Sequence, residues 1–303
     1  MAARQRSRAR NLLEFWLFRA ARGIATSLAP ASLAALGSGL GAVYGVVGQS
    51  RRRILHFNLA HALPELEPAA RRRLGWAIAR HFGRVSLDAL RVQRLTPEAL
   101  LAEVRVEGEE HLWAARAEGR GVLLLSAHIG GWEVAALAGG LLVPGGLAVV
   151  HRPLDNPLLE AELLRFRARF GNRSLGKRGI VREILRELRS EGVVGILIDQ
   201  RARPGEAITV PFFGRPVAAH PILARLALRT AAPVVPLWGL WEGPGRYTVR
   251  FDPPLRAVAG DDDLSLTARY MATIEGVIRE RPEQWLWFHD RWRDERLAEA
   301  GGE

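Results

Sequence analysis

Residues 121–137 read GVLLLSAHIGGWEVAAL, and this stretch is the strongest structural signal in a chain of 303 residues. The apolar run Val122–Leu125 follows Gly121 and has the length and continuity of a buried strand. Polar and glycine residues then interrupt the run, and a helix is expected from Trp132 onward. Open α/β sheets hold their reactive groups at such strand-to-helix turns. We therefore expect the chemistry of this chain at residues 126–133.

His128 and Glu133 are the reactive pair that this turn suggests. On one continuous helix, residues five apart point about 140° away from each other, because each residue turns by about 100°. With His128 in the turn and Glu133 in the first helical turn, the carboxylate can fold back to the imidazole. A carboxylate on one ring nitrogen fixes the tautomer and leaves the other nitrogen as a base. The alternative is a helix-capping histidine beside a surface glutamate.

The block SAHIGGWE resembles the His-x4-acid motif of the glycerolipid acyltransferase superfamily. Its GGWE ending resembles the lipid A biosynthesis branch, the lauroyl/myristoyl acyltransferases of Gram-negative inner membranes. Three further blocks extend the resemblance over nearly the whole chain: Asp199-Gln200 after the buried run at 193–198, VPFFG at 210–214, and PEQWLW at 282–287. Asp290 departs from the pattern, because a basic residue is expected there.

The resemblance also bears on the arginines after the second strand. The family carries an arginine ahead of a glycine on a helix that follows an Asn-Pro, and this arginine acts near the reacting groups. Arg167, four residues before Gly171, matches it best, but Arg165 and Arg169 are close enough to leave the assignment open. Arg152, in the Arg-Pro turn, is a second candidate. A solvated basic helix explains the three helical arginines equally well.

The VPFFG block raises two structural alternatives for Phe212, Phe213 and Gly214. Adjacent aromatic residues in a loop between proline and glycine are either a local core plug or one wall of an apolar groove. The residues alone favour the plug. The resemblance favours the groove, which would hold the acyl chain of a substrate.

Composition limits the classes of function. The chain has no cysteine, which excludes disulfides, cysteine-ligated zinc and a thiol nucleophile. P-loop, nucleophile-elbow and HExxH sequences are absent, and the histidine spacing indicates no metal cluster, so we expect neither cofactor nor metal. The net charge of +11 suits anionic partners. Nucleic acid is disfavoured among them, because no groove-reading motif accompanies the charge.

Two segments make up the predicted organisation. Residues 1–50 form a basic arm and a membrane-anchoring helical segment, and residues 51–303 form the catalytic domain. After Pro30 the sequence predicts a main apolar helix over 31–48, with glycines at 37, 41 and 45 in the small-xxx-small pattern of close helix packing. A buried soluble helix is the alternative to one membrane anchor, and a secretory signal peptide is disfavoured because the apolar run is too long.

The predicted fold class is α/β, with a mixed β-sheet flanked by helices. Six strands are expected, mostly separated by helices, and that order favours a sheet covered on both faces. They begin near Val104, Val122, Leu147, Val193, Val234 and Tyr247. The resemblance implies the glycerolipid acyltransferase-like version of this architecture with an N-terminal membrane-associated helix.

We expect acyl transfer from a thioester to a hydroxyl of a membrane glycolipid. His128 would act as general base and Glu133 would orient it. Arg167 or Arg152 would stabilise the thioester oxyanion or bind an acceptor phosphate, and Asp199 would orient an arginine or the acceptor.

The resemblance further implies acyl carrier protein as donor, with coenzyme A as the alternative, and a lipid A precursor as acceptor. It places the enzyme on an anionic membrane surface, the bacterial inner membrane, with its catalytic domain on the cytoplasmic side. A lysophospholipid or a mannosylated phosphoinositide is the alternative acceptor. A non-catalytic membrane lipid-binding protein is the alternative outside enzymes.

Overall fold

A seven-stranded mixed sheet forms the centre of the computed structural model, which describes residues 7–176 and 179–301. Of the basic arm expected at residues 1–10, residues 1–6 lie outside the described part. The strand order is β1-β9-β8-β2-β5-β3-β4, and every neighbouring pair is parallel except β8 with β9. The strands are β1 (Val104–Glu107), β2 (Val122–Ser126), β3 (Leu147–Val150), β4 (Arg173–Leu175), β5 (Val193–Leu197), β8 (Val234–Gly243) and β9 (Arg246–Phe251). The predicted α/β class with a mixed sheet is confirmed.

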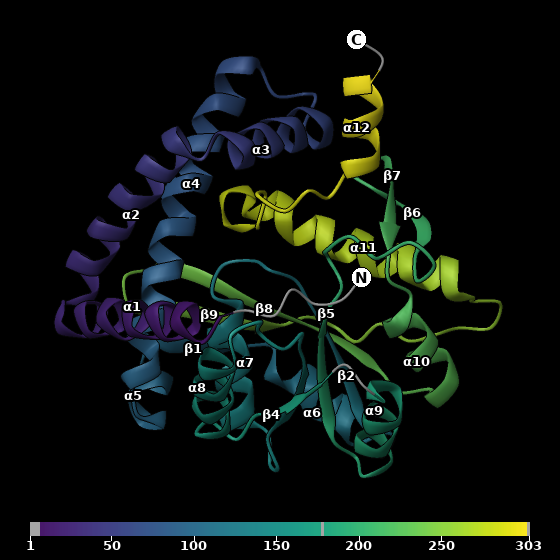
Figure 1. Cartoon of the computed structure of the whole chain (residues 1–303). Coiled ribbons are helices and arrows are strands. Elements are labelled where there is room, and N and C mark those ends of the chain that lie inside the picture. The colour runs from purple at the N-terminus through teal and green to yellow at the C-terminus, as the bar shows by residue number, and fades with distance from the viewer. Residues whose placement is uncertain (1–6, 177–178, 302–303) are drawn as a thin grey trace.

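Helices cover both faces of this sheet (Figure 1). Leu123 and Leu125 of β2 face the core shared with α9, α10 and α11, whereas Val122 and Leu124 face the core shared with α6 and α7. This alternation explains why β2 is apolar at each of its first four positions, Val122–Leu125. The helices are α1 (Arg8–Ser27), α2 (Pro30–Val47), α3 (Gln49–Ala62), α4 (Pro68–Arg91), α5 (Pro97–Ala102), α6 (Glu109–Arg116), α7 (Trp132–Leu142), α8 (Pro157–Ala168), α9 (Ile180–Arg189), α10 (Ile222–Thr230), α11 (Asp263–Glu280) and α12 (Arg293–Gly301).

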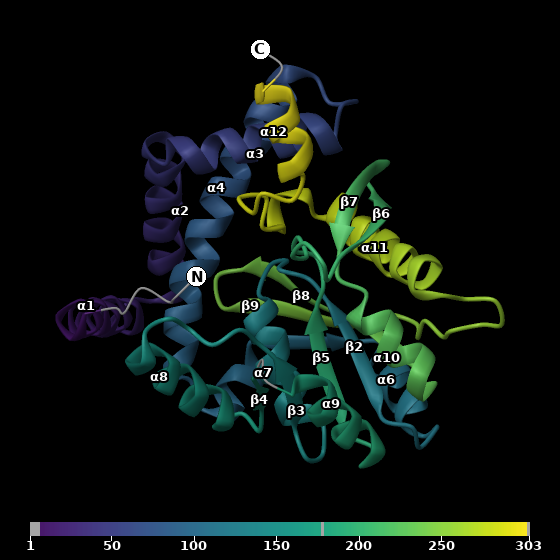
Figure 2. The same ribbon diagram turned by 45° about the vertical axis from the view of Figure 1, so that its right-hand side comes forward.

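The VPFFG block lies in a hairpin, where a loop was expected. Strands β6 (Ile208–Phe212) and β7 (Arg215–Ala219) pair antiparallel as a separate two-stranded sheet. Pro211 made this segment look irregular, but a two-stranded sheet has only edge strands, where the missing N–H of proline is tolerated. The hairpin lies against α11 and near α12 in both views (Figures 1 and 2).

The glycine repeat of α2 packs directly on α4. A Cβ atom on Gly41 would come within 2.1 Å of the Ala79 carbonyl oxygen, and one on Gly83 would come within 2.0 Å of the Gly37 carbonyl oxygen. The two backbones are therefore in contact along the repeat. Figure 2 shows α2 lying alongside α4, which continues towards the sheet. The glycines that predicted close helix packing thus fix the N-terminal helices to the rest of the protein.

We expect Gly41→Ala to destabilise the fold while Gly39→Ala does not. At Gly41 the new methyl group meets the backbone of α4, and such overpacking costs about 1–3 kcal/mol. Position 39 has no atom within 4 Å of an added Cβ, so the same change there only gains the higher helix propensity of alanine, about 1 kcal/mol. Denaturant unfolding of both variants measures the difference. Equal stability of the two would contradict the α2–α4 packing.

Candidate active site

His128 and Asp199 meet because two parallel strands end side by side. Strands β2 and β5 are paired in register through Ser126 and Leu197, and each reactive residue lies two positions beyond its strand. The imidazole Nδ1 lies 2.9 Å from Asp199 Oδ1, and the backbone N–H of His128 donates to Asp199 Oδ2 at 3.0 Å. The carboxyl ends of these strands therefore build the pair, at the position where open α/β sheets hold their ligands.

Asp199 is an ionised carboxylate held inside the protein. It is 1% exposed, and Trp285 donates its indole N–H to Oδ2 at 2.9 Å. Burial alone raises the pKa of Asp199, but the charge of His128 and the donated hydrogen bonds outweigh it and lower that pKa. For His128 burial lowers the pKa, and the charge and hydrogen bond of Asp199 raise it above its usual value. The pair is therefore polarised, with the negative charge on Asp199.

The second ring nitrogen of His128 remains available. With Nδ1–H donated to Asp199, Nε2 carries the lone pair. The side chain is 23% exposed, so this nitrogen is within reach of a substrate. The amide nitrogen of Gln200 lies 3.3 Å from Nε2, and the ring of Trp132 lies 5.3 Å from the imidazole between centroids. A base flanked by an amide and an indole is suited to removing a proton from a bound hydroxyl group.

Glu133 pairs with Arg167, which corrects the role we expected for its carboxylate. Arg167 donates from Nε to Oε1 at 2.7 Å and from Nη2 to Oε2 at 2.9 Å. Glu133 is the second residue of α7, after Trp132. Arg167 binds both of its carboxylate oxygens, and the imidazole of His128 is bonded to Asp199 instead. Glu133 still acts on His128 through its charge, which contributes to raising the pKa of His128.

Arg167 is the arginine of α8 that turns inward. It is 9% exposed, whereas Arg165 and Arg169 are exposed at the surface. Arg165 donates to Glu162, and Arg169 donates to the Gln93 and Leu95 carbonyls. The charge and hydrogen bonds of Glu133 raise the pKa of Arg167 against the lowering effect of its burial. Its third nitrogen, Nη1, is buried without a hydrogen-bond partner among the described residues.

Arg152 lies apart from this group. Its side chain is exposed, and its guanidinium is 3.7 Å from the Asp155 carboxylate in the turn before α8. The structure therefore joins His128, Asp199, Glu133 and Arg167 in one site and leaves Arg152 at the surface.

Phe212 and Phe213 fill a core, as the residues alone favoured, and do not face a groove. They are 0% and 6% exposed, and Phe212 stacks on Trp292 with its centroid 5.7 Å away and an interplanar angle of 16°. Phe212 also touches the ring of Trp285, which holds Asp199. Gly214, the third residue of the groove interpretation, is exposed in the turn of the β6–β7 hairpin. Phe212 therefore packs against the residue that donates to Asp199 and helps to hold the His128–Asp199 pair in place.

The C-terminal segment is an unforeseen part of the site. Leu286 donates its backbone N–H to the His128 carbonyl at 3.0 Å, and Gly130 donates to the Gln284 carbonyl at 2.9 Å. Gly130 has φ of 51°, and a Cβ there would lie 2.3 Å from the Gly239 carbonyl oxygen, so only glycine fits this turn. Trp285 belongs to the PEQWLW block, but its bond to Asp199 was not predictable from the sequence, because 86 residues separate the two.

Comparison with known proteins gives the family that this chain matches. Residues 3–294 match the family described as bacterial lipid A biosynthesis acyltransferase. The lipid A biosynthesis lauroyltransferase of Escherichia coli is 29% identical over 266 residues, covering 85% of this chain and 84% of the relative. The lipid A biosynthesis myristoyltransferase of Escherichia coli is 27% identical and covers 82% and 77%. A phosphatidylinositol mannoside acyltransferase of Mycolicibacterium smegmatis is 27% identical and covers 73% and 74%.

We expect Asp199→Asn to lower the pKa of His128 and to reduce turnover by about 10⁴-fold, on the scale of triads that lose their carboxylate. The wild-type base is neutral, so kcat/KM should fall as the pH drops through a pKa above 6.5, since Asp199 raises it. In Asp199→Asn the fall of kcat/KM at low pH should therefore shift to lower pH, and the maximal rate should also be lower. NMR titration of the imidazole measures the pKa, and kcat/KM against pH measures the shift.

Glu133→Gln is the matched comparison, because it removes a carboxylate that does not touch the imidazole. It should move the His128 pKa less than Asp199→Asn does, and it should destabilise the fold by about 3–5 kcal/mol by leaving the Arg167 guanidinium buried without its ion partner. If Glu133→Gln moves the imidazole pKa more, Glu133 and not Asp199 is the group that tunes the base.

Proposed function

Because the chain belongs to the bacterial lipid A biosynthesis acyltransferase family, we propose that it transfers a fatty acyl group from an acyl carrier protein thioester to a hydroxyl of a lipid A precursor in the inner membrane. The chain is an O-acyltransferase, like the relatives whose names state this activity. The observation that carries the reaction is the His128–Asp199 pair, a base with one nitrogen fixed and the other open.

In the proposed reaction, His128 Nε2 takes the proton of the acceptor hydroxyl as its oxygen attacks the thioester carbonyl. A carbon–oxygen bond forms, the carbon–sulfur bond breaks, and the leaving thiolate receives the proton from the imidazolium. Asp199 stabilises that imidazolium, because its charge lies 2.9 Å from Nδ1. The acyl group passes directly to the acceptor, and the protein needs no nucleophile of its own.

Arg167 supplies positive charge beside this base. Glu133 occupies Nε and Nη2, so Nη1 is the donor left for a substrate oxygen, either the thioester oxyanion or an acceptor phosphate. We propose the oxyanion role for Arg167, because a guanidinium held by a bidentate carboxylate keeps its direction during the reaction. Arg152, exposed and 3.7 Å from Asp155, is proposed only as a surface contact for the substrates.

The acceptor class is the part of the proposal for which the relatives offer an alternative. Phosphatidylinositol mannoside acyltransferases resemble this chain at nearly the same identity as the lipid A enzymes. A mannosylated phosphoinositide, or a lysophospholipid, would leave the role of His128 unchanged and would replace only the acceptor. Donor identity is likewise a proposal, supported by the net charge of +11, which suits an acidic carrier protein.

We further propose that residues 1–50 seat the enzyme on the membrane without crossing it, while residues 51–303 form the catalytic domain. By length and composition α2 could span a bilayer, and its 18 residues are about 27 Å long. However, its glycine face is backed by α4, whose Arg84 donates to Ser38 of α2 at 3.2 Å. A spanning α2 would carry this arginine into hydrocarbon, at a cost of about 3 kcal/mol.

The opposite face of α2 supports the same proposal. Apolar side chains there are exposed and recur at helical spacing, and α1 adds more of the same kind. On α2 they are Leu36, Leu40, Val43 and Val47, and on α1 they are Leu13, Trp16, Leu17 and Ile24. Such amphipathic helices lie in the membrane interface with one face in the acyl boundary. The active site would then open at the level of the lipid headgroups.

The function is tested by incubating purified protein with labelled acyl carrier protein and inner-membrane lipids, with products identified by mass. Wild type should label a lipid A precursor, and His128→Ala should lose at least about 10²-fold in rate, because the general base is gone. The variant should keep lipid binding, and its free energy of unfolding should fall, because the buried Asp199 carboxylate loses the imidazole that pairs with it.

Label on a phospholipid or another glycolipid would keep the mechanism and replace the acceptor. Equal labelling by His128→Ala would overturn the role of the base. With carrier protein and coenzyme A thioesters both tried, the absence of any label would favour a lipid-binding protein without catalysis.

If residues 1–50 lie on the membrane without crossing it, both ends of α2 face the same side of the bilayer. Since the chain has no cysteine, single cysteines can be placed at the exposed positions Ser27 and Gln49, which flank α2. A membrane-impermeant maleimide should label both from the side that also labels Ala60→Cys, an exposed control position on α3. Labelling of the two ends from opposite sides would show that α2 crosses the membrane.

A further inference from the structure

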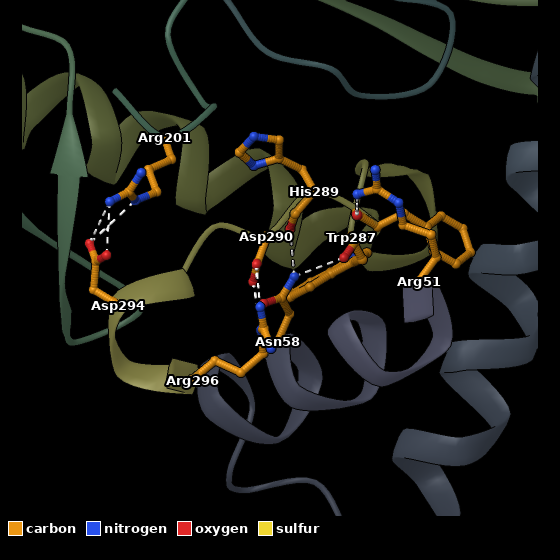
Figure 3. A network of polar contacts seen from close by, with 9 residues as sticks. Arg51, Asn58, Arg201, Trp287, His289, Asp290, Asp294 and Arg296 are labelled. Atoms are coloured by element: carbon orange, nitrogen blue, oxygen red, sulfur yellow. Dashed lines mark hydrogen bonds and ion pairs between the residues drawn. The ribbon is translucent and has the colours of Figure 1, made fainter. Parts of the chain in front are cut away.

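A basic pocket of about 470 Å³ lies between α3, α12 and the segment that follows β5. Its lining includes Arg51, Arg201, Arg293 and Arg296, and Asp290 is the carboxylate among the residues that line it. Figure 3 shows most of these side chains, drawn from α3, from the C-terminal segment and from the chain beyond β5. Four cations around one carboxylate make this an anion-binding site by charge.

Two of these arginines have no carboxylate partner among the described residues. Arg296 forms a two-bond pair with Asp290, and Arg201 pairs with Asp294 at 2.8 Å. Arg51 donates to the Phe288 carbonyl at 3.2 Å, and exposed Arg293 makes neither a hydrogen bond nor an ion pair within the described ranges. The pocket therefore has two cationic charges to spare. A phosphate monoester carries about 1.5 to 2 negative charges at neutral pH and matches that surplus.

Two stretches of chain connect the pocket lining to the active site. Arg201 follows Asp199 by two residues, a distance of at most about 7 Å along the chain. His289 lines the pocket and comes three residues after Leu286, whose N–H is bonded to the His128 carbonyl. Burial lowers the pKa of His289 to about 4, with smaller effects from the charges of Asp199 and His128. His289 is therefore a neutral imidazole in the pocket lining, and it is near enough to Asp199 and His128 to be affected by their charges.

The walls of the pocket are fixed in position. Asn58 of α3 is buried and donates from its amide nitrogen to the Trp287 and His289 carbonyls, both at 2.8 Å (Figure 3). These bonds tie α3 to the segment that carries the catalytic contacts of Trp285 and Leu286. A group bound in the pocket is thereby held at a set distance from His128, which is what positioning a substrate requires.

The source of the phosphate follows from the location of the pocket. Helix α2 ends at Val47, which is 68% exposed, and Ser50 and Arg51 already line the pocket. Where the apolar face of α2 meets the membrane, its end lies at the level of the headgroups, and the pocket opens beside it. Resting on the proposed acyltransferase function, we propose that this pocket binds a phosphate monoester on the headgroup of the acceptor lipid and so presents the acceptor hydroxyl to His128.

The test uses the full-length protein with phosphatidylcholine vesicles that contain either phosphatidic acid, a phosphate monoester, or phosphatidylglycerol, a diester, matched for zeta potential. Wild type should bind the phosphatidic acid vesicles about tenfold more tightly, as expected for one or two charge-assisted hydrogen bonds. Arg293→Gln and Arg51→Gln/Arg293→Gln should lose this preference. Arg53→Gln removes the same charge from the exposed surface of α3, outside the pocket lining, and should keep it.

Arg293→Gln is the leading variant because this exposed side chain makes no bond that folding would miss. Arg293→Lys should restore part of the preference. The proposal is overturned if wild type shows no preference, or if Arg53→Gln loses as much of it as Arg293→Gln. It is also overturned if inorganic phosphate without vesicles binds as tightly as the lipid, because the ligand is then free phosphate.

An acyl-transfer assay shows whether the phosphate bound in the pocket belongs to the acceptor or to the donor. Arg293→Gln should raise the KM for the acceptor about tenfold and leave kcat and the KM for acyl carrier protein within about twofold. A rise in the donor KM alone would assign the phosphate to the carrier's prosthetic group and overturn the lipid assignment. If wild type transfers no acyl group at all, the proposed function fails, while the vesicle experiment still decides whether the pocket selects a phosphate monoester.

Discussion

The Asp199 carboxylate is the group on which the rest of this site depends. It is buried and ionised, and such a group is stable only where donors surround it. Its donors come from two distant parts of the chain: the backbone and ring of His128 after β2, and the indole of Trp285 near the C-terminus. The need to satisfy one charge therefore explains why the C-terminal segment returns to the sheet and closes against the β2–α7 turn. Loss of any donor would leave that charge without compensation.

The aromatic residues gain their meaning from this constraint. Trp285 can hold Asp199 only if the indole cannot rotate, and Phe212, Trp287 and Trp292 pack around it. The β6–β7 hairpin supplies Phe212, so a segment outside the main sheet helps to orient the indole that donates to Asp199. The VPFFG block therefore contributes to the position of the His128–Asp199 pair through its packing on Trp285.

The sequence predicted elements well wherever a local pattern determines them. The apolar runs at β2 and β5 could be recognised without knowledge of their neighbours. The predicted carboxylate contact of His128 was wrong, because the sequence offered Glu133 five residues away and gave no strand order. Once β2 and β5 are adjacent and in register, Asp199 is nearer to the imidazole than Glu133 can be. The missing information was that β2 and β5 pair. His128 and Asp199, which follow these strands, are 71 residues apart in the sequence, and no local periodicity indicates such a pairing.

The N-terminal helices and the His128–Asp199 pair are coupled through rigid contacts. Helix α2 is locked to α4 by backbone contact at the glycines, and α3 is locked by Asn58 to the segment that holds Trp285. Neither link can bend without separating hydrogen bonds or backbone surfaces that are in contact. A bilayer that orients α2 must therefore also set the height of His128 and of the basic pocket above the lipid. Under the proposed function, an acceptor in the membrane is then recognised by its headgroup, because the protein fixes the distance from the proposed phosphate site to the base.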